Sequence, residues 1–222
     1  MGHFILLLFL VIPLNIRAAE RIYVGSFSSG NLDGWEEKIF KGKTHYQLED
    51  DNQTKVLHAK SNGGASGMVQ EITVDLKKTP ILNWSWRVSN HLKDLDERSK
   101  SGDDYPARIY IVVSGGFAFW KTRSLNYVWA SKMPVGSHWP NAYAKDNVIM
   151  IALQSGKQGV GQWHHQQRNI RADFKRYFGK DIDSIDAVAI MTDTDNSGQK
   201  AVAWYGDIFF TAEPDSLQLS NQ

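Results

Sequence analysis

The chain has 222 residues, with 25 Lys and Arg against 24 Asp and Glu and a formal net charge of +1. This balance argues against nucleic acid as the main partner, because proteins that bind a phosphate backbone usually carry a clustered basic excess. The sequence holds no cysteine, which excludes disulfides, thiol catalysis, iron–sulfur clusters and cysteine-ligated zinc. Hydrophobic residues make up 42% and charged residues 22%, a mixture typical of a globular domain.

An unbroken apolar run occupies residues 4–12. It is too short for a transmembrane helix, which needs about 20 apolar residues, but it suits the hydrophobic part of a signal peptide. The small residues Ala18 and Ala19 follow it. We therefore expect residues 1–19 to be a signal peptide and residues 20–222 to form one domain, periplasmic or secreted, with no stable membrane insertion after cleavage. An uncleaved membrane anchor and a buried N-terminal strand are the alternatives.

Apolar and polar residues alternate over many short segments separated by turn signals, which is the pattern of β-strands. The clearest is ILNWSWRV at residues 81–88. In chain order, strands are expected at residues 44–48, 56–60, 67–75, 81–88, 107–113, 126–130, 148–153, 186–191 and 201–210. Residues 90–106 are charged and lack strand periodicity, so they predict a long surface loop.

One segment has the pattern of a helix. Asn169 suits the N-cap, Ile170, Phe174 and Phe178 recur at helical spacing, and Gly179 stands where a helix commonly ends. Strands greatly outnumber helices along the rest of the chain. The sequence therefore predicts an all-β fold, an antiparallel two-sheet β-sandwich of the jelly-roll kind with one short helix.

Two groups of carboxylates could carry chemistry. Asp193 and Asp195 alternate with polar residues like the first half of an EF-hand loop, but Trp204 stands where the closing glutamate belongs, so an EF-hand is rejected. The two aspartates are left as candidates for ligand or metal contact, or for turn hydrogen bonds. Asp104 together with Asp193 or Asp195 could also supply the acid and base of a glycan hydrolase or lyase, which needs two carboxylates about 5–9.5 Å apart.

Aromatic, arginine and aspartate side chains share strand faces if the most aliphatic face of each strand is assigned to the core. Such a face suits sugar rings, which stack on aromatic side chains and form hydrogen bonds at their rims, or a carboxylate-bearing polymer held by arginine. The alternative is a second packing layer beneath a long loop. The predicted ligand-binding residues are Arg87, Asp104, Arg108, Tyr127, Trp129, Asp193, Asp195 and Tyr205.

Asp207 lies in an otherwise apolar strand close to the C-terminus. A carboxylate there is costly unless it is paired, hydrogen-bonded or bound to a metal. Loop oxygens in the opening segment, residues 27–36, could meet it if the first and last strands pair. A structural calcium between the two ends is one interpretation, and hydrogen bonds to Asp207 are the other.

Several motifs carry a resemblance to a known family. The order of these motifs resembles an uncharacterised family of exported bacterial proteins, a domain of unknown function, over nearly the whole chain after residue 19. The resemblance implies export but no reaction. The motifs include WSWRV at 84–88, GDDYPAR at 102–108, WPNAY at 139–143 and MTDTD at 191–195.

A second, weaker resemblance involves the two ends of the chain. The opening Phe27…Gly34-Trp35 and the closing aromatic-x-Asp207-hydrophobic strand are similar to galactose-binding-like jelly rolls, which include many carbohydrate-binding modules. In such modules the matching ends often hold calcium, so the resemblance implies Asp207 and Glu36 as metal ligands. Gly206 stands where those modules commonly have a second aspartate.

The sequence as a whole favours a non-catalytic exported binding protein for a saccharide or a cell-envelope glycan. A glycan hydrolase or lyase that uses paired aspartates is the first alternative. A structural envelope protein, which would work through an exposed apolar patch, is the second.

Overall fold

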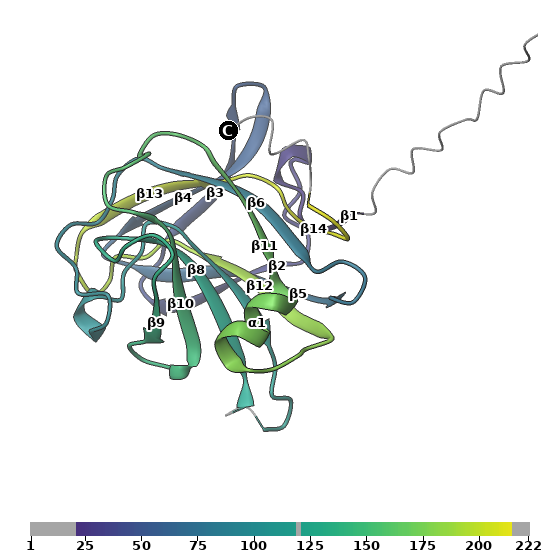
Figure 1. Cartoon of the computed structure of the whole chain (residues 1–222). Helices are drawn as coiled ribbons and strands as arrows, with labels where there is room; N and C mark the ends of the chain where they lie inside the picture. Colours follow the sequence, from purple (N-terminus) through teal and green to yellow (C-terminus); the bar gives the residue numbers. More distant parts are fainter. Residues whose placement is uncertain (1–20, 119–120, 215–222) are drawn as a thin grey trace, which may run out of the picture.

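The computed structural model describes residues 21–118 and 121–214, so the predicted signal peptide at 1–19 lies outside the described residues. Two seven-stranded sheets face each other in a β-sandwich (Figure 1). The architecture is the all-β jelly-roll sandwich that the strand pattern predicts. Within the described residues, no helix has the length and apolar character needed to cross a bilayer.

The first sheet, here called sheet A, is centred on strand β6. One edge of β6 pairs with β11, and its other edge pairs with β13 and β14 in succession. Gly206 and Asp207 separate β13 from β14, so the single strand predicted at 201–210 is in fact two strands with different outer neighbours. The members of sheet A are β1 (Arg21–Gly25), β3 (His45–Asp51), β4 (Thr54–Asn62), β6 (Ile81–Val88), β11 (His164–Asn169), β13 (Lys200–Tyr205) and β14 (Ile208–Thr211).

The second sheet, sheet B, has the strand order β2-β5-β12-β7-β8-β10-β9. Its pairs are antiparallel except that β8 and β10 run parallel, a departure from the fully antiparallel prediction. The chain between these two strands includes β9, which pairs antiparallel with β10 and so provides the crossover that a parallel pair needs. The members are β2 (Trp35–Lys41), β5 (Ala65–Asp75), β7 (Arg108–Val113), β8 (Arg123–Ala130), β9 (His138–Asn141), β10 (Lys145–Ser155) and β12 (Ser184–Met191).

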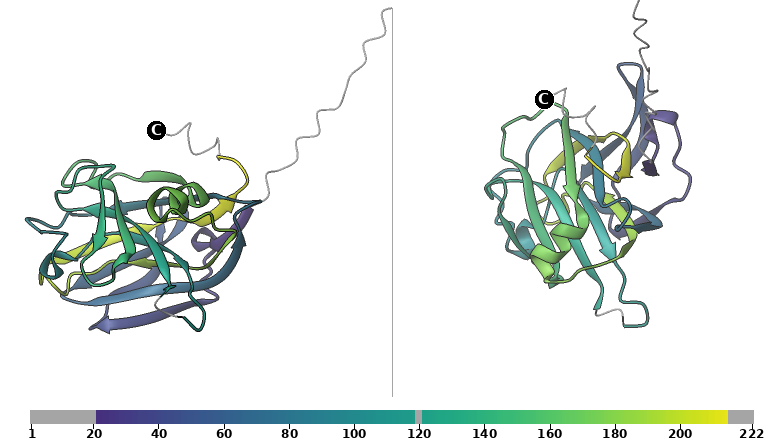
Figure 2. Two further views of the ribbon diagram at one scale, coloured as in Figure 1. Left: turned by 60° about the horizontal axis from the view of Figure 1, so that its bottom comes forward. Right: turned by 45° about the vertical axis from the view of Figure 1, so that its right-hand side comes forward.

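The predicted helix is present as α1 (Ile170–Phe178), and it lies at one side of the sandwich (Figure 2). The Asn169 side chain accepts the Ala172 N–H at 2.9 Å, and Gly179 ends the helix with φ 66°. Ile170 and Phe174 are buried in the main core, so the apolar face of α1 helps to close that side. Two short 3-10 turns, η1 (Phe27–Ser29) and η2 (Lys100–Gly102), complete the described elements.

The core between the sheets is built from large aromatic side chains. Trp84 and Trp86 of β6 point inward, as the alternation predicts, with ring centres 5.5 Å apart. Tyr127 and Trp129 of β8 and Tyr205 of β13 are also fully buried in this core.

The prediction that Tyr127, Trp129 and Tyr205 face a ligand is therefore wrong. On β8 the aliphatic Val128 points to the outer side of sheet B, in the opposite direction to the aromatic rings. An aromatic ring buries more apolar area than valine, so the rings occupy the space between the sheets. Both faces of β8 are buried, so the strand has no polar, solvent-facing side from which its orientation could be predicted.

Residues 90–106 form an irregular segment, as predicted, but not a purely superficial one. Leu92, Glu97 and Tyr105 are fully buried. One Glu97 carboxylate oxygen accepts the backbone N–H groups of Ser131, Lys132 and Met133 at 2.6, 3.0 and 3.3 Å. The segment is therefore anchored against the chain that follows β8.

We expect Trp129→Ala to lower the free energy of unfolding by about 3–5 kcal/mol, because it removes a buried ring and the hydrogen bond from its Nε1 to the Gly156 carbonyl at 3.0 Å. Trp129→Phe keeps much of the ring volume and should cost less. Urea denaturation followed by circular dichroism measures both. Unchanged stability of Trp129→Ala would contradict the inward placement of this ring.

Candidate functional site

A groove of about 470 Å³ opens on the outer face of sheet B. Ile109 and Ile111 of β7 point into the core, so the alternate residues Arg108 and Tyr110 face the groove. The lining comes from strands across the sheet and from the loops at its edge: Phe40, Lys41, Ala65, Asp103, Arg108, Tyr110, Asn126, Asn141, Tyr143, Ala144, Val148, Met191, Asp193, Asp195 and Asn196.

A buried ion pair lies on the floor of the groove. Arg108 Nη2 is 2.6 Å from Asp193 Oδ2, and the two side chains are only 5% and 1% exposed. The Arg108 Cζ lies 5.2 Å from the ring centres of both Tyr105 and Tyr110. A charge-assisted contact between groups so deeply buried is held in one geometry by its surroundings.

The strand register explains why these two residues meet. Arg108 begins β7 and pairs with Met191, the last residue of β12, so Asp193 emerges from the sheet directly beside Arg108. Tyr205 supports this junction from the core side. Its hydroxyl donates to the Met191 carbonyl at 2.8 Å and accepts the Arg108 N–H at 3.3 Å. Tyr205 therefore positions the site from beneath and does not line the groove.

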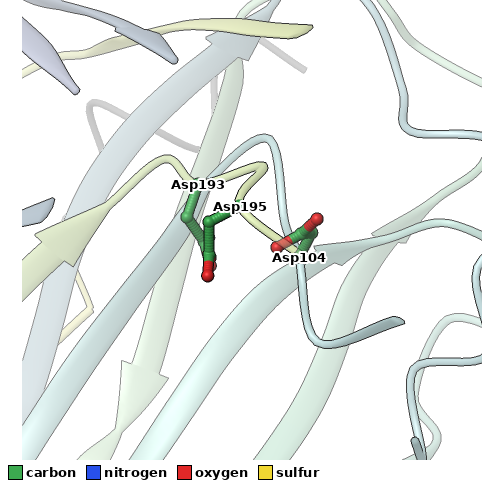
Figure 3. Close-up of side chains that lie close together, drawn as sticks. All are labelled: Asp104, Asp193 and Asp195. Atoms are coloured by element: carbon green, nitrogen blue, oxygen red, sulfur yellow. The ribbon is translucent and has the colours of Figure 1, made fainter. Parts of the chain in front are cut away.

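Three aspartates converge beside this pair. One oxygen from each of Asp104, Asp193 and Asp195 lies within 4.8 Å of the other two. Asp193 and Asp195 point to the same side, while Asp104 approaches from a neighbouring loop (Figure 3). Asp104 is fully buried, and its oxygens accept the backbone N–H groups of Asn196 at 3.2 Å and Ser197 at 2.6 Å. Asp104 thus holds the loop after Asp195 in place.

Asp195 is the most accessible of the three carboxylates, with a side chain that is 13% exposed. Its Oδ2 lies 3.7 Å from the Lys41 Nζ, which also donates to the Asp195 carbonyl at 3.0 Å. Asp103 also lines the groove; it is buried and accepts the Asn141 Nδ2 at 3.0 and 3.1 Å. The groove therefore presents a carboxylate and an ammonium group together at its mouth.

Burial dominates the acid–base behaviour of these carboxyls. It raises the pKa of Asp193 above the ordinary value, against the opposing charge of Arg108. It also raises the pKa of Asp103 and of Asp195, and the charge of Asp104 adds to the increase for Asp195. These carboxyls therefore hold their protons to a higher pH than an exposed aspartate does.

Two exposed aromatic rings flank the groove. Phe40 is 71% and Tyr143 is 53% exposed. The Tyr143 hydroxyl donates to Asn196 Oδ1 at 2.7 Å, which fixes the ring at the edge of the groove. The sequence interpretation named neither residue as a ligand contact, although Tyr143 belongs to one of the family motifs. The available signal was the pair Ile39-Phe40, two apolar residues in the otherwise polar segment WEEKIFK.

The predicted ligand-binding set divides into three groups. Arg108, Asp193 and Asp195 line one groove, and Asp104 joins them from the adjacent loop. Arg87 does not belong to this site, because it lies on the outer face of sheet A between the rings of Trp163 and Trp204. The remaining predicted residues, Tyr127, Trp129 and Tyr205, belong to the core.

The proposed calcium ligands Asp207 and Glu36 do not fit a common site. Asp207 Oδ1 accepts the Ser28 N–H at 2.8 Å, and its Oδ2 accepts the Ser28 hydroxyl at 2.5 Å, so this carboxylate joins the chain ends by hydrogen bonds. Glu36 follows the core-packed Trp35 on β2, so it points outward from sheet B, where it pairs with Lys38 at 2.8 Å. The two residues lie on opposite outer faces of the sandwich, so the geometry does not bring them together as ligands of one ion.

Comparison with known proteins identifies the family of the chain. A family described as a protein of unknown function (DUF3047) matches residues 33–209, which is more than half of the chain. The chain therefore belongs to this family, as its sequence motifs indicated. No curated protein sequence matches the chain.

Solved structures with similar strand arrangements include the endoglucanase Cel12A from Rhodothermus marinus, at 10% identity over 88% of this chain and 96% of that chain, with a TM-score of 0.49. A second is the module CBM27-1 of Caldicellulosiruptor saccharolyticus in complex with mannohexaose, at 13% identity over 89% of this chain and 100% of that chain, with a TM-score of 0.43. A third is the enzymatically active domain of tailspike protein 4 of bacteriophage CBA120, at 10% identity over 85% of this chain and a TM-score of 0.42; this chain spans 21% of its length. Likenesses this distant leave the ligand of the present chain to be argued from its own residues.

Arg108→Ala should lower the free energy of unfolding by about 3–5 kcal/mol, because it leaves the buried Asp193 without its cation. The double variant Arg108→Met with Asp193→Leu removes both charges and should lose less than the single variant. Urea denaturation of the wild type and both variants provides the comparison. A double variant that is less stable than Arg108→Ala would contradict this account of the pair.

The stability difference between Asp195→Asn and the wild type should depend on pH. Burial holds the pKa of Asp195 in the folded protein above its ordinary value of 3.8, which applies to the unfolded chain. As the pH rises above 3.8, Asp195 ionises first in the unfolded chain, so the wild type loses stability until the folded protein ionises as well. The variant should therefore gain stability relative to the wild type across that interval and then level off. Ser101→Ala, which removes no titrating group, should differ from the wild type by a constant amount. A difference for Asp195→Asn that falls with rising pH would contradict the raised pKa.

Proposed function

We propose that the chain is an exported, non-catalytic protein that binds a saccharide in the groove of sheet B. The observation that carries the proposal is the combination of two exposed rings, Phe40 and Tyr143, with a charged floor in this groove of about 470 Å³. This volume lies in the usual range for small-ligand sites. Sugar rings present apolar faces that stack on aromatic side chains and hydroxyl groups that need directed hydrogen-bond partners.

The polar groups of the groove suit hydroxyl recognition. Asp195 accepts hydrogen bonds, the neighbouring Lys41 ammonium donates them, and their charged atoms lie 3.7 Å apart. The Tyr110 hydroxyl makes only a 3.5 Å contact to the Met191 sulfur among the described residues, which leaves it able to exchange hydrogen bonds with a ligand. A saccharide hydroxyl can satisfy such groups in both directions.

The charge of the groove indicates the class of saccharide. The acidic side chains that line the groove are Asp103, Asp193 and Asp195, and the basic side chains are Lys41 and Arg108. Arg108 is already paired with Asp193, so it offers no free positive charge to a carboxylate-bearing polymer. We therefore propose a neutral saccharide as the ligand, because an acidic glycan would face an excess of negative charge.

Hydrolysis is the second candidate function, since the carboxyl oxygens of Asp104, Asp193 and Asp195 are close enough to act together. The contacts that already engage these carboxylates favour a binding role over a catalytic one. Asp104 is buried and engaged by backbone N–H groups, and Asp193 is engaged by Arg108. Only Asp195 presents a partly exposed carboxylate. Release of reducing ends from a bound oligosaccharide, abolished by Asp195→Asn, would establish hydrolysis in place of simple binding.

A structural envelope role is less well supported by the same surface. The large exposed apolar side chains of the described residues include Phe40 and Tyr143, which border a groove with the Arg108–Asp193 ion pair on its floor rather than forming an apolar patch by themselves. An interface for a permanent partner is normally a contiguous apolar area. The arrangement therefore fits a small polar ligand better.

Glycan-array screening followed by titration calorimetry tests the proposal. Tyr143→Ala and Phe40→Ala should each weaken binding of a retained neutral glycan by about tenfold, through loss of one stacking surface of roughly 1.4 kcal/mol. Phe117→Ala removes an exposed ring outside the groove and is the matched control. Equal affinity of all three variants and the wild type would remove the groove as the binding site.

A further inference from the structure

A row of stacked side chains crosses the outer face of sheet A. The register places His58 of β4 opposite Trp204 of β13, and Trp204 opposite Arg87 of β6. His58 and Trp204 stack with ring centres 5.3 Å apart and planes at 25°. The Arg87 Cζ lies 4.3 Å from the ring centre of Trp204 and 5.1 Å from that of Trp163. The row thus runs from His58 through Trp204 and Arg87 to Trp163, which directly precedes β11.

Two carboxylates of β3 hold this row in place. Glu49 accepts the Trp204 Nε1–H and lies 3.3 Å from His58 Nδ1. Asp51 accepts the Trp163 Nε1–H at 2.9 Å and lies 3.4 Å from Arg87 Nη1. The rings are therefore ordered before any ligand arrives, which reduces the entropy cost of binding at this surface.

A hollow of about 500 Å³ lies beside the row. Its lining includes the ring of Trp163 and the nearly buried Phe209, over which the Arg21 guanidinium lies at 4.8 Å. The residues Ser28, Thr54 and Ser85 contribute hydroxyl groups, of which that of Ser28 donates to Asp207. Two cations, Arg21 and Lys55, are balanced by two carboxylates, Asp51 and Asp207. The hollow therefore combines apolar ring surface and hydroxyl groups without an excess of charge.

One buried polar group in the hollow has no partner. His165 lines it opposite Ser85 in the pairing of β11 with β6, and its Nδ1 makes no hydrogen bond among the described residues. Burial, with a contribution from His164, lowers the pKa of His165, so its imidazole is neutral at neutral pH. The Nδ1 atom is shielded from solvent, so the ring must rotate slightly before this nitrogen can meet a ligand group. A buried nitrogen without a partner favours such a rotation, because a hydrogen bond to a ligand removes the cost of leaving it unpaired.

We propose that this hollow is a second binding site, which takes a neutral saccharide with a ring against Trp163 and a hydroxyl group on His165. The choice of ligand class rests on the proposed function of the groove, but the site stands on separate residues. The groove lies on the outer face of sheet B and the hollow on that of sheet A, so one molecule can hold two glycan segments on opposite sides.

The two sites can be distinguished because the described lining of the groove contains no tryptophan, whereas Trp163 lines the hollow. Cellohexaose and mannohexaose are titrated into the ¹⁵N-labelled protein, and the indole N–H resonances of Trp163 and Trp204 are followed. Trp163→Phe and Trp204→Phe assign these resonances. We expect the Trp163 resonance to shift in a saturable manner with at least one hexasaccharide, and to do so equally in Tyr143→Ala.

Two further variants test the hollow. Ser85→Gln adds volume on its floor and leaves Trp163 in place, so it should weaken the saturable shift by about tenfold. His165→Phe removes the unpartnered nitrogen and should also weaken it. The Tyr143 and Asn196 backbone resonances, which report the groove, should respond to ligand in both variants as in the wild type.

Each outcome bears on one site or the other. Groove resonances that shift while Trp163 does not would overturn the second site and leave the proposed function intact. A Trp163 shift that survives Ser85→Gln and His165→Phe unchanged would also overturn it. A Trp163 shift without any response of the groove would support the second site and contradict the groove. No response to either hexasaccharide at millimolar concentration would contradict both.

Discussion

The buried ion pair between Arg108 and Asp193 is the contact on which the groove depends. It joins the first residue of β7 to the segment that follows β12, and it lies where that segment leaves the sheet. Asp193 also accepts the Tyr105 N–H at 3.3 Å, so the long segment 90–106 meets the same carboxylate. Two loops far apart in the chain are thus fixed to one another at the floor of the site. Loss of either partner would leave an uncompensated buried charge at this junction.

The direction of the pleats decides what each face of the sandwich offers. The inner faces carry the rings of Trp84, Trp86, Tyr127 and Trp129, which leaves Arg108 and its aspartates outside sheet B and Arg87 outside sheet A. The outer surface of sheet B holds the groove, with carboxylates and exposed rings at its edge. The outer surface of sheet A holds the stacked row, with a charge-balanced hollow beside it. Each face therefore has the rigid aromatic and polar groups that saccharides need, built from different residues.

Much of the fold could be predicted from local patterns. Residues 81–88 alternate clearly and form β6 with the predicted bounds, and Asn169 and Gly179 mark the two ends of α1. Strands β2 and β11 could not be found in this way. WEEKIFK is largely exposed at an edge of sheet B, and HHQQRN is polar on both faces, so neither segment has a hydrophobic period. Their pairing with β5 and β6 determines their conformation instead.

The site could be predicted only where the chemistry is confined to one face. Arg108 was found because it alternates with the aliphatic residues of its strand, and Asp193 and Asp195 because they alternate with polar residues in an oxygen-rich segment. Tyr127 and Trp129 were placed on the wrong face because β8 is buried on both sides. Its residues do not alternate between apolar and polar, so the pattern cannot show which side faces the core. Phe40 and Tyr143 were missed because their importance comes from their positions around the groove, which only the tertiary arrangement creates.

The most direct test of the central claim is a crystal structure of the protein with a neutral oligosaccharide retained from a glycan array. The account predicts a sugar ring against Tyr143 or Phe40, with a hydroxyl group within hydrogen-bond distance of the Asp195 carboxylate. A bound oligosaccharide that contacts neither ring, with the floor around Arg108 and Asp193 left untouched, would contradict the assignment of this groove.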